Sequence, residues 1–529
     1  MNRKIICKYE ECNEEANTPH DNEFCIFHSE KDKGITGIEF NDLIFKQIEK
    51  GDYNFKGYVF PTGISFMEMV FKKEVDFTWA KFKGKFEEGV FEDLCVVFFD
   101  AKFNSKVSFL GAEFSGGEVN FMSAEFTGEE TTFVDAKFSG GCVVFSNTKF
   151  SGGTANFEGA IFSEGDAIFA NVEFSGGSAD FESVKFYGGY AYFRGAKFSG
   201  GKAYFNGVIF YNDVIFDENK IRYSLDFSGI KLSDKSTFYF KNPKFIEYDE
   251  NIIITFSDIS FNPFYAYFEN INYNNKNKKN DDYISPVIIF RYCNLKDVYF
   301  TNNDISLFSF YKSAYDEARF YSCEWKKQSG RRKNIICDEE LYKKVESIKE
   351  RKEKEKFKKD YEIEDLNGYN EIATLYRRFK TSLDNTKDYA EAGHFYFNEC
   401  EMKRKYFKSL KWKGNFWDKL RGKLYWLCKI FMGYGERPLW SFSWFLIFGI
   451  IIFPIAHIIN GLDVPLGETL CLAAIKYTFS RFLPSTYLPE KWVYIESTGS
   501  GFVPFLNSLV LILFVIFIGI GLKRHFRRF

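Results

Sequence analysis

The sequence has few of the residue patterns that enzymes and secreted proteins use. Only 5 of its 529 residues are histidine. It contains no Walker phosphate loop, no dinucleotide-binding fingerprint after a strand, and no H-E-x-x-H or G-x-S-x-G motif. Its 11 cysteines lack the spacing of a disulfide framework, which favours a reducing compartment. No apolar signal-peptide core opens the chain. We therefore predict a protein that is neither an enzyme nor secreted.

Phenylalanine is the residue in excess, with 66 copies. Between residues 121 and 210 successive phenylalanines are separated alternately by five and by seven positions, so the repeat is twelve residues long. The ladder consists of Phe121, Phe126, Phe133, Phe138, Phe145, Phe150, Phe157, Phe162, Phe169, Phe174, Phe181, Phe186, Phe193, Phe198, Phe205 and Phe210. A small or β-branched residue usually stands two positions before each phenylalanine, as Ala155 and Ala160 do.

This spacing does not keep one face of an α-helix, whereas residues i−2 and i point the same way on an extended chain. The small residue and the phenylalanine therefore enter the same interior. Ser-Gly-Gly segments supply corners where the chain turns, as at residues 139–141. A short fixed period indicates stacked units, none of which buries its apolar face alone. The pattern predicts a mainly β fold, a solenoid with a stacked phenylalanine core.

The small-x-Phe-x-x unit resembles that of the pentapeptide-repeat proteins. The resemblance implies a right-handed quadrilateral β-helix, which we expect over residues 35–325. This chain departs from the family's five-residue step by inserting two residues in every second unit, so we expect one coil to contain two twelve-residue units. Soluble members of the family bind topoisomerases by mimicking DNA. The apolar segments near the C-terminus argue against that role here, and we expect no nucleic-acid partner.

Residues 1–34 contain Cys7, Cys12, Cys25 and His28 in a C-x4-C-x12-C-x2-H pattern. Zn²⁺ prefers four such ligands in a tetrahedron, and a segment this small needs a metal to fold. We predict a structural zinc site in an N-terminal cap, with His20 as the alternative fourth ligand. The competing interpretation is three unrelated buried cysteines and a surface histidine.

Residues 338–410 differ in composition and spacing from the phenylalanine repeats. The charged run Glu339–Asp360 predicts a mostly solvated helix. Apolar residues at helical spacing then predict a helix over residues 371–383 and a second helix that begins near Tyr389, together a helical hairpin. The Y-R-x-x-K segment at Tyr376 is similar to the one that follows the repeats in membrane-attached pentapeptide-repeat proteins. A basic juxtamembrane segment, residues 411–438, follows.

Residues 439–460 and 502–522 are each apolar and long enough to span a bilayer. Basic residues precede the first span and follow the second, so the positive-inside rule predicts a hairpin with both termini in the cytoplasm. We therefore expect a two-span membrane domain over residues 439–529 of a multi-pass cell-membrane protein. The connecting segment, residues 461–501, is expected to lie outside or to be re-entrant.

A shorter apolar segment between the spans, residues 470–482, gives this domain some similarity to the pore module of tetrameric cation channels. The selectivity-filter motif is missing after that segment. The only Gly-Tyr-Gly, Gly433–Gly435, precedes the first span, and we interpret it as a juxtamembrane turn. The sequence thus favours a membrane-anchored scaffold whose β-helix binds an unidentified protein partner. The alternative is a homo-oligomeric, channel-like pore with the β-helix as its sensor.

Overall fold

The computed structural model describes residues 6–10, 12–16, 21–84, 94–246, 252–261, 265–273, 287–327, 334–410, 415–459, 469–480 and 502–526. The chain divides into two compact units. The first comprises Met1–Gly330 and Ile335–Leu366, and the second comprises Arg331–Asn334 and Asn367–Phe529.

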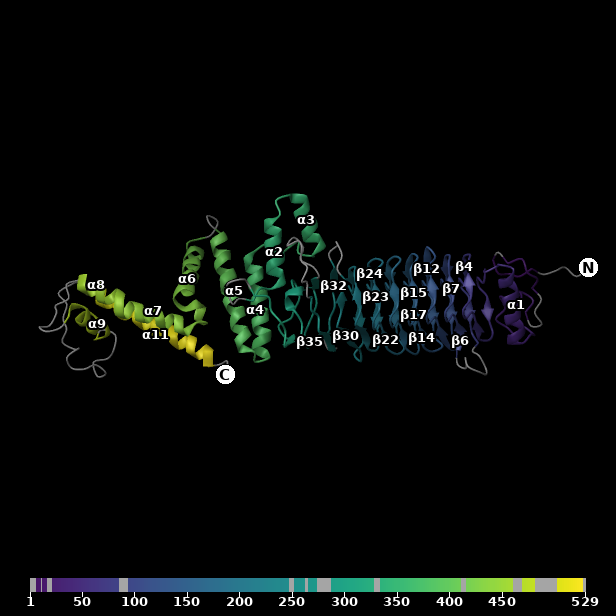
Figure 1. The fold of residues 1–529 in the computed structure, drawn as a ribbon, viewed down its shortest axis with the longest axis horizontal. Helices are drawn as coiled ribbons and strands as arrows, with labels where there is room; N and C mark the ends of the chain where they lie inside the picture. The colour runs from purple at the N-terminus through teal and green to yellow at the C-terminus, as the bar shows by residue number, and fades with distance from the viewer. Residues whose placement is uncertain are drawn as a thin grey trace, which may run out of the picture. The chain divides into compact units, whose positions relative to one another are not determined.

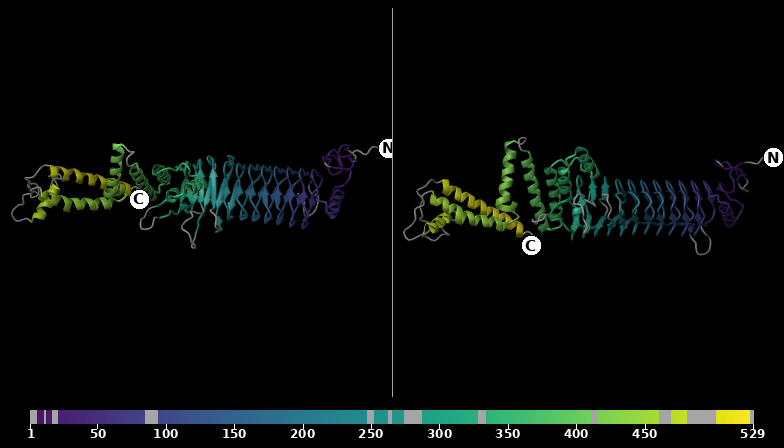
Figure 2. Two further views of the ribbon diagram at one scale, coloured as in Figure 1. Left: turned by 90° about the horizontal axis from the view of Figure 1, so that it is seen from above. Right: turned by 45° about the horizontal axis from the view of Figure 1, so that its top comes forward.

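The first unit is built around a β-solenoid with four parallel sheets, and Figures 1 and 2 show its coils stacked along one axis. Sheet 1 contains β1 (Val59–Phe60), β5 (Lys81–Phe82), β9 (Glu113–Phe114), β13 (Lys137–Phe138), β17 (Ile161–Phe162), β21 (Lys185–Phe186), β25 (Ile209–Phe210) and β29 (Lys231–Leu232). Sheet 2 contains β2 (Ile64–Ser65), β6 (Leu94–Val97), β10 (Glu118–Asn120), β14 (Val143–Val144), β18 (Ala167–Ile168), β22 (Ala191–Tyr192), β26 (Val214–Asp217), β30 (Thr237–Lys241), β33 (Tyr265–Glu269), β35 (Val298–Thr301) and β37 (Arg319–Tyr321).

The other two sides complete the square. Sheet 3 contains β3 (Val70–Phe71), β7 (Lys102–Phe103), β11 (Glu125–Phe126), β15 (Lys149–Phe150), β19 (Glu173–Phe174), β23 (Lys197–Phe198), β27 (Lys220–Ile221) and β31 (Lys244–Phe245). Sheet 4 contains β4 (Val75–Asp76), β8 (Val107–Ser108), β12 (Glu130–Thr132), β16 (Thr154–Asn156), β20 (Ala179–Asp180), β24 (Ala203–Tyr204), β28 (Leu225–Asp226), β32 (Ile253–Ser257), β34 (Val287–Arg291) and β36 (Phe308–Ser309). The predicted quadrilateral β-helix is confirmed, but its strands run from Val59 to Tyr321. The expected start at residue 35 is wrong, because Gly37–Glu49 forms an α-helix.

The register shows that one coil contains two twelve-residue units. Phe138 pairs with Phe162, which pairs with Phe186, so each residue meets its equivalent two repeats later. The phenylalanine rings stack in the interior with the same period. The rings of Phe133 and Phe157 have centroids 4.8 Å apart and planes within 2°. Both side chains are fully buried, as the ladder predicts.

Helices and a short 3-10 turn complete the first unit. α1 (Gly37–Glu49) begins with a capping box at Thr36 and buries Phe40 and Ile44. The Phe40 ring packs edge-on against Phe60 of the first coil, at 5.8 Å. At the other end lie η1 (Ile305–Leu307), α2 (Cys337–Ser347) and α3 (Arg351–Asp360).

The prediction of a mostly solvated helix over residues 339–360 is wrong in its first half. The charged run forms two helices, and α2 buries Leu341 and Val345, because apolar residues recur four positions apart on one of its faces. α3 has no buried residue and fits the expectation.

The second unit contains the predicted helical hairpin. α4 (Tyr369–Asn385) and α5 (Tyr389–Ser409) pack together, with the Phe379 and Phe395 rings stacked at 5.2 Å. α6 (Phe416–Met432) follows and ends at Gly433 in the left-handed conformation. The Gly-Tyr-Gly segment is a turn, as predicted: it forms η2 (Gly433–Gly435), and the Tyr434 hydroxyl donates to the Glu401 carboxylate at 2.8 Å.

The last elements are apolar helices. α7 (Pro438–Ile447), the π-helical turn η3 (Phe448–Ile452) and α8 (Phe453–Ile459) run on as one segment, and α9 (Leu470–Ser480) and α11 (Phe502–Phe526) follow. Pro438–Ile459 and Phe505–Lys523 are long and apolar enough to cross a membrane, with mean hydropathies of 2.3 and 2.7. Most of the connecting segment 461–501 and the terminal residue Phe529 lie outside the described residues.

Candidate functional site

The structure brings the four predicted metal ligands together. The ligand atoms of Cys7, Cys12, Cys25 and His28 all lie within 4.8 Å of one another. The Sγ atoms of Cys12 and Cys25 are 3.8 Å apart, and His28 Nδ1 lies 3.1 Å from Cys25 Sγ and 3.6 Å from Cys7 Sγ. Zn–S bonds of about 2.3 Å in a tetrahedron place two sulfur atoms about 3.8 Å apart, so the cluster has the size of a zinc site.

The backbone around the cluster explains why residues distant in sequence meet. An antiparallel bridge between Ile6 and Glu15 turns the chain back on itself. The Lys8 amide then donates to the Glu23 carbonyl at 2.8 Å, which places Cys7 beside Cys25. The Cys25 amide in turn donates to Cys7 Sγ at 3.3 Å, a contact that stabilises a thiolate.

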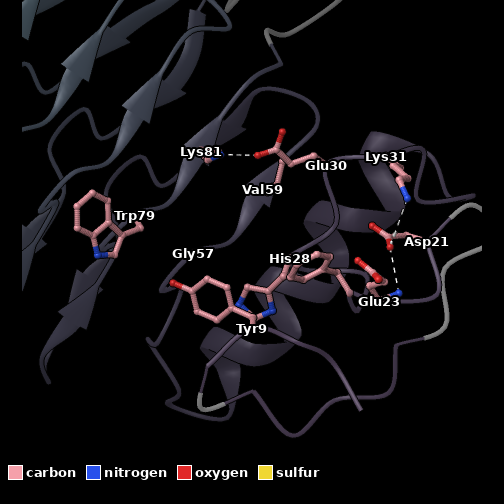
Figure 3. Close-up of a pocket in the computed structure, with 11 residues that line it drawn as sticks. Tyr9, Asp21, Glu23, His28, Glu30, Lys31, Gly57, Val59, Trp79 and Lys81 are labelled. Carbon is pink, nitrogen blue, oxygen red and sulfur yellow. Dashed lines mark hydrogen bonds and ion pairs between the residues drawn. The ribbon is translucent and has the colours of Figure 1, made fainter. Parts of the chain in front are cut away.

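A second contact fixes the orientation of the histidine. His28 Nε2 lies 3.0 Å from the Lys56 carbonyl oxygen, to which it donates a hydrogen bond, so Nδ1 is left as the atom that faces the cysteines. A hydrogen bond of this kind from the far ring nitrogen is the usual support of a metal-bound histidine. The Tyr9 ring covers the imidazole at 4.1 Å with planes 8° apart (Figure 3).

Burial keeps the imidazole of the cluster neutral, but it opposes the ionisation of two of the thiols. Burial lowers the pKa of His28, so the ring is neutral and its Nδ1 lone pair is free at neutral pH. Burial raises the pKa of Cys25 to about 12 and also raises that of Cys12. Metal binding at such thiols releases protons, and the affinity therefore rises with pH. A structural site with four protein ligands leaves no open position for catalysis.

Sequence reasoning missed two parts of this site. The Lys56 carbonyl and the Tyr9 ring belong to no ligand motif, and only the packing of the segment on the first coil reveals them. The alternative ligand His20 lies outside the described residues. The segment is attached to the solenoid through the Val59 amide, which donates to the Phe27 carbonyl at 2.7 Å.

Over several coils, the outer surfaces of sheets 1 and 3 carry charged columns in which acidic and basic residues alternate. On sheet 1, Glu113 lies between Lys81 and Lys137, at 4.0 and 3.0 Å. On sheet 3, Glu125 lies between Lys102 and Lys149, at 3.5 and 3.0 Å. On these coils, residues of opposite sign therefore meet. Further along sheet 3 the alternation ends, because Lys197, Lys220 and Lys244 follow one another in register.

Sheet 2 is different, because its outward residues form an apolar and aromatic column. The column is continuous in the strand register and consists of Val144, Ile168, Tyr192, Ile215, Tyr239, Tyr267 and Tyr299. The Tyr267 ring stacks on Tyr239 at 5.4 Å and on Tyr299 at 5.0 Å. Each side chain in the column is half-buried. We call this surface the aromatic column.

Cations border the aromatic column. Lys241 Nζ lies 4.6 Å from the centroid of the Tyr239 ring, and Arg319 Cζ lies 5.2 Å from that of Tyr299. Lys241 also pairs with Glu269 at 3.0 Å, and Arg319 with Asp297 at 2.7 Å. The surface therefore combines stacked rings with a rim of paired charges, a composition that protein interfaces favour.

Comparison with known proteins identifies the repeat. A family model described as pentapeptide repeats (9 copies) matches residues 133–185. These residues lie within the four-sheet solenoid, so the fold is a pentapeptide-repeat β-solenoid. No curated protein and no solved structure matches the chain.

Proposed function

We propose that this protein is a membrane-anchored scaffold, which presents the rigid β-solenoid at the inner face of the cell membrane. The observation that carries the proposal is the combination, in one chain, of the solenoid with two apolar helices long enough to span a bilayer. Only 22% of the apolar stretch in each of these two helices is buried within the structure. A core helix of a soluble protein is, by contrast, mostly buried. Exposed apolar residues on both helices fit contact with lipid.

The charge around the spans supports a cytoplasmic location for both flanks. Residues 403–437 contain 11 Lys/Arg and 2 Asp/Glu, and four basic residues follow the second span: Lys523, Arg524, Arg527 and Arg528. Such residues resist translocation. The solenoid and the C-terminus are therefore on the same side, and the connection between the spans is outside or re-entrant.

The aromatic column is the surface that we assign to the protein partner. Tyrosine is enriched among the residues that dominate binding energy, and the paired charges of sheets 1 and 3 offer a partner little to gain. The partner's contact surface is expected to be mainly apolar, to match the column. Replacing Tyr239, Tyr267 and Tyr299 by serine would remove the surface, whereas replacing Lys102, Lys137 and Lys149 would provide the matched control.

The Cys/His cluster is proposed to bind one structural Zn²⁺ through Cys7, Cys12, Cys25 and His28. The donor set, its tetrahedral size and the Lys56 contact to His28 support zinc over a hard oxygen-seeking cation. The ion would stabilise the segment that covers the first coil. This cap would keep the exposed strand edges of the solenoid from pairing with other chains.

One observation favours the alternative, an oligomeric pore. Asn507 and His457 are fully buried within apolar helices, and Asn507 Nδ2 donates to the Thr478 carbonyl at 2.9 Å, which links α11 to α9. Polar residues at membrane depth often mark a pathway, although they also join helices. The mass of the detergent-solubilised protein separates the two functions, since a monomer excludes the pore and a symmetric tetramer favours it.

Membrane extraction tests the scaffold proposal. The full-length protein should stay with the membrane pellet in alkaline carbonate and leave it only with detergent. The double variant Ile451→Arg, Ile516→Arg should lose this behaviour, because each arginine costs about 2.5–3.5 kcal/mol at the centre of a span. The control Ile451→Val, Ile516→Val should behave as the original chain does. Release of the original chain without detergent would overturn the proposal.

A further inference from the structure

α6, the helix between the α4–α5 hairpin and the first apolar span, leaves much of its apolar surface uncovered. Its only buried residue is Met432. The large apolar side chains that it exposes are Phe416, Trp417, Leu424, Trp426 and Leu427. An apolar surface of this extent on one helix indicates a contact with something outside the chain. The aromatic column lies on the solenoid and does not account for it.

The apolar residues of α6 form a stripe along one side of the helix. The stripe consists of Phe416, Leu420, Leu424, Leu427 and Phe431. Its members are three or four positions apart, so they share one helical face. The other side of the helix packs on α5, where the Tyr425 ring stacks on Phe407 at 5.8 Å and Lys429 Nζ donates to the Glu401 carboxylate at 2.9 Å. We call the exposed face the apolar stripe.

The C-terminal end of the apolar stripe continues into the two apolar spans. The Phe431 ring contacts Trp444 and Phe448 of the first span, with centroids at 5.1 and 6.0 Å. It also contacts Phe514 of the second span at 5.7 Å. Figures 1 and 2 show that α6 crosses the direction of α7 and α11 instead of continuing it. With the two spans across a bilayer, α6 therefore lies along the bilayer surface.

Basic side chains border the apolar stripe. Lys419 and Lys423 are four positions apart and lie along one edge of it, and both are exposed. Arg421 is 64% exposed, and its only acidic neighbour on the helix, Asp418, lies 3.7 Å away. Helices that lie in the membrane interface have this composition, with Trp, Phe and Leu on one face and Lys or Arg beside them. Anionic headgroups attract such cations.

We propose that α6 lies in the membrane interface and binds the headgroups of anionic phospholipids. The apolar stripe contacts the acyl chains, and the long side chains of Lys419 and Lys423 reach the headgroups above them. A protein partner fits this face less well, because the stripe ends against the spans, whose exposed neighbours are lipids. This inference rests on the proposed membrane anchoring and adds a lipid-binding site to it.

Quenching by nitroxide lipids tests the site in the full-length protein. In a background without reactive thiols, Leu427→Cys or Ile516→Cys is labelled with an environment-sensitive fluorophore, and the protein is placed in phosphatidylcholine nanodiscs. We expect a nitroxide near the headgroup to quench the label at position 427 more than one near the end of the acyl chain. The order should reverse at position 516, which lies within the second span. Glu158→Cys on the solenoid should be quenched by neither.

The charge of the lipid is tested with the nitroxide on phosphatidylglycerol or on phosphatidylcholine at the same mole fraction. At position 427 we expect phosphatidylglycerol to quench about fivefold more, because one lysine near an anionic headgroup favours it by about that factor. The variant Lys419→Gln, Lys423→Gln should lose this preference. The control Lys220→Gln, Lys244→Gln removes two exposed lysines from the solenoid and should keep it.

The two labelled positions separate this site from the membrane anchoring. No quenching at either position 427 or position 516 would overturn both. Quenching at position 516 without quenching at position 427 would overturn the lipid site alone. Equal quenching by the two lipids at position 427, or a preference that survives Lys419→Gln, Lys423→Gln, would contradict the assignment of the ligand as anionic phospholipid.

Discussion

The middle of the solenoid and its two ends are stabilised by different chemistry. In the middle, each phenylalanine stacks on its equivalent in the next coil, as Phe157 does on Phe181 at 4.9 Å and 2°. At the N-terminal end, the Cys/His segment and α1 cover the first coil. At the C-terminal end, a buried guanidinium holds the following segment in place: Arg291 donates to the carbonyls of Tyr361 and Glu362, both at 2.8 Å.

The difference arises because a middle coil and an end coil have different neighbours. A middle coil is covered on both sides by a copy of itself, so one apolar unit repeated many times is enough. An end coil leaves backbone groups and an apolar face without a matching copy. At the C-terminal end Asp338 provides hydrogen-bond acceptors for some of these groups. Its carboxylate accepts hydrogen bonds from the Ser309 hydroxyl at 2.5 Å and the Phe310 amide at 3.1 Å. Burial raises the pKa of Asp338 and lowers that of Arg291.

The largest expected effect is in the middle. Phe157→Ala should lower the free energy of unfolding of the solenoid by about 3–5 kcal/mol, because a fully buried ring leaves a cavity. Glu158→Ala, whose exposed side chain is one residue further on, should change it by less than about 0.5 kcal/mol. Thermal unfolding measures both, and equal shifts for the two variants would show that the assignment of the inward face is wrong.

The C-terminal end should be nearly as sensitive. Arg291→Met keeps the length of the side chain but leaves Asp338 and several carbonyl oxygens without their cation, at a cost of about 3 kcal/mol. Arg319→Met is the matched control. Its side chain is 42% exposed and pairs with Asp297, so the loss should be below about 1 kcal/mol. Chemical denaturation distinguishes these outcomes, and an equal loss in both variants would mean that Arg291 contributes no more than a surface cation.

A smaller and local effect is expected at the N-terminal end. Cys25→Ser should lower bound zinc below one ion per chain and increase protease cleavage within residues 21–34, while the melting of the solenoid changes little. Elemental analysis of protein purified without chelator gives the first quantity. If the unmutated protein contains no zinc, the proposed metal site is wrong and the cysteines are simply buried thiols.

The smallest effect belongs to the charged columns. Lys137→Met breaks a contact with Glu113 between side chains that are 54% and 37% exposed. Solvent screens such pairs, so stability should change by less than about 0.5 kcal/mol, and less still at high salt. A loss comparable with that of Phe157→Ala in thermal unfolding would show that the columns, rather than the stacked rings, stabilise the coils.

The sequence was most informative where the structure is periodic. The five-and-seven spacing predicted the inward phenylalanines and the two-unit coil, because a strict repeat forces equivalent residues into register. The cysteine spacing likewise predicted which four side chains the fold brings together. Both inferences depend on local rules, since strand alternation and ligand spacing do not require knowledge of distant contacts.

Features that depend on irregular coil lengths could not be predicted in this way. The pairing of Tyr239 with Tyr267 and of Tyr267 with Tyr299 joins residues at unequal sequence separations, so no period reveals the aromatic column. The role of Arg291 depends on carbonyl groups about seventy residues later in the chain.

The central claim is that the solenoid and the C-terminus lie on the same side of a membrane. The accessibility of single introduced cysteines tests this claim most directly. In a background without reactive thiols, cysteine is placed at Glu158, Lys491 or Phe529, and intact cells are treated with an impermeant maleimide. The account predicts labelling of Lys491→Cys alone, and labelling of Glu158→Cys and Phe529→Cys only after permeabilisation. Labelling of either Glu158→Cys or Phe529→Cys in intact cells would contradict it.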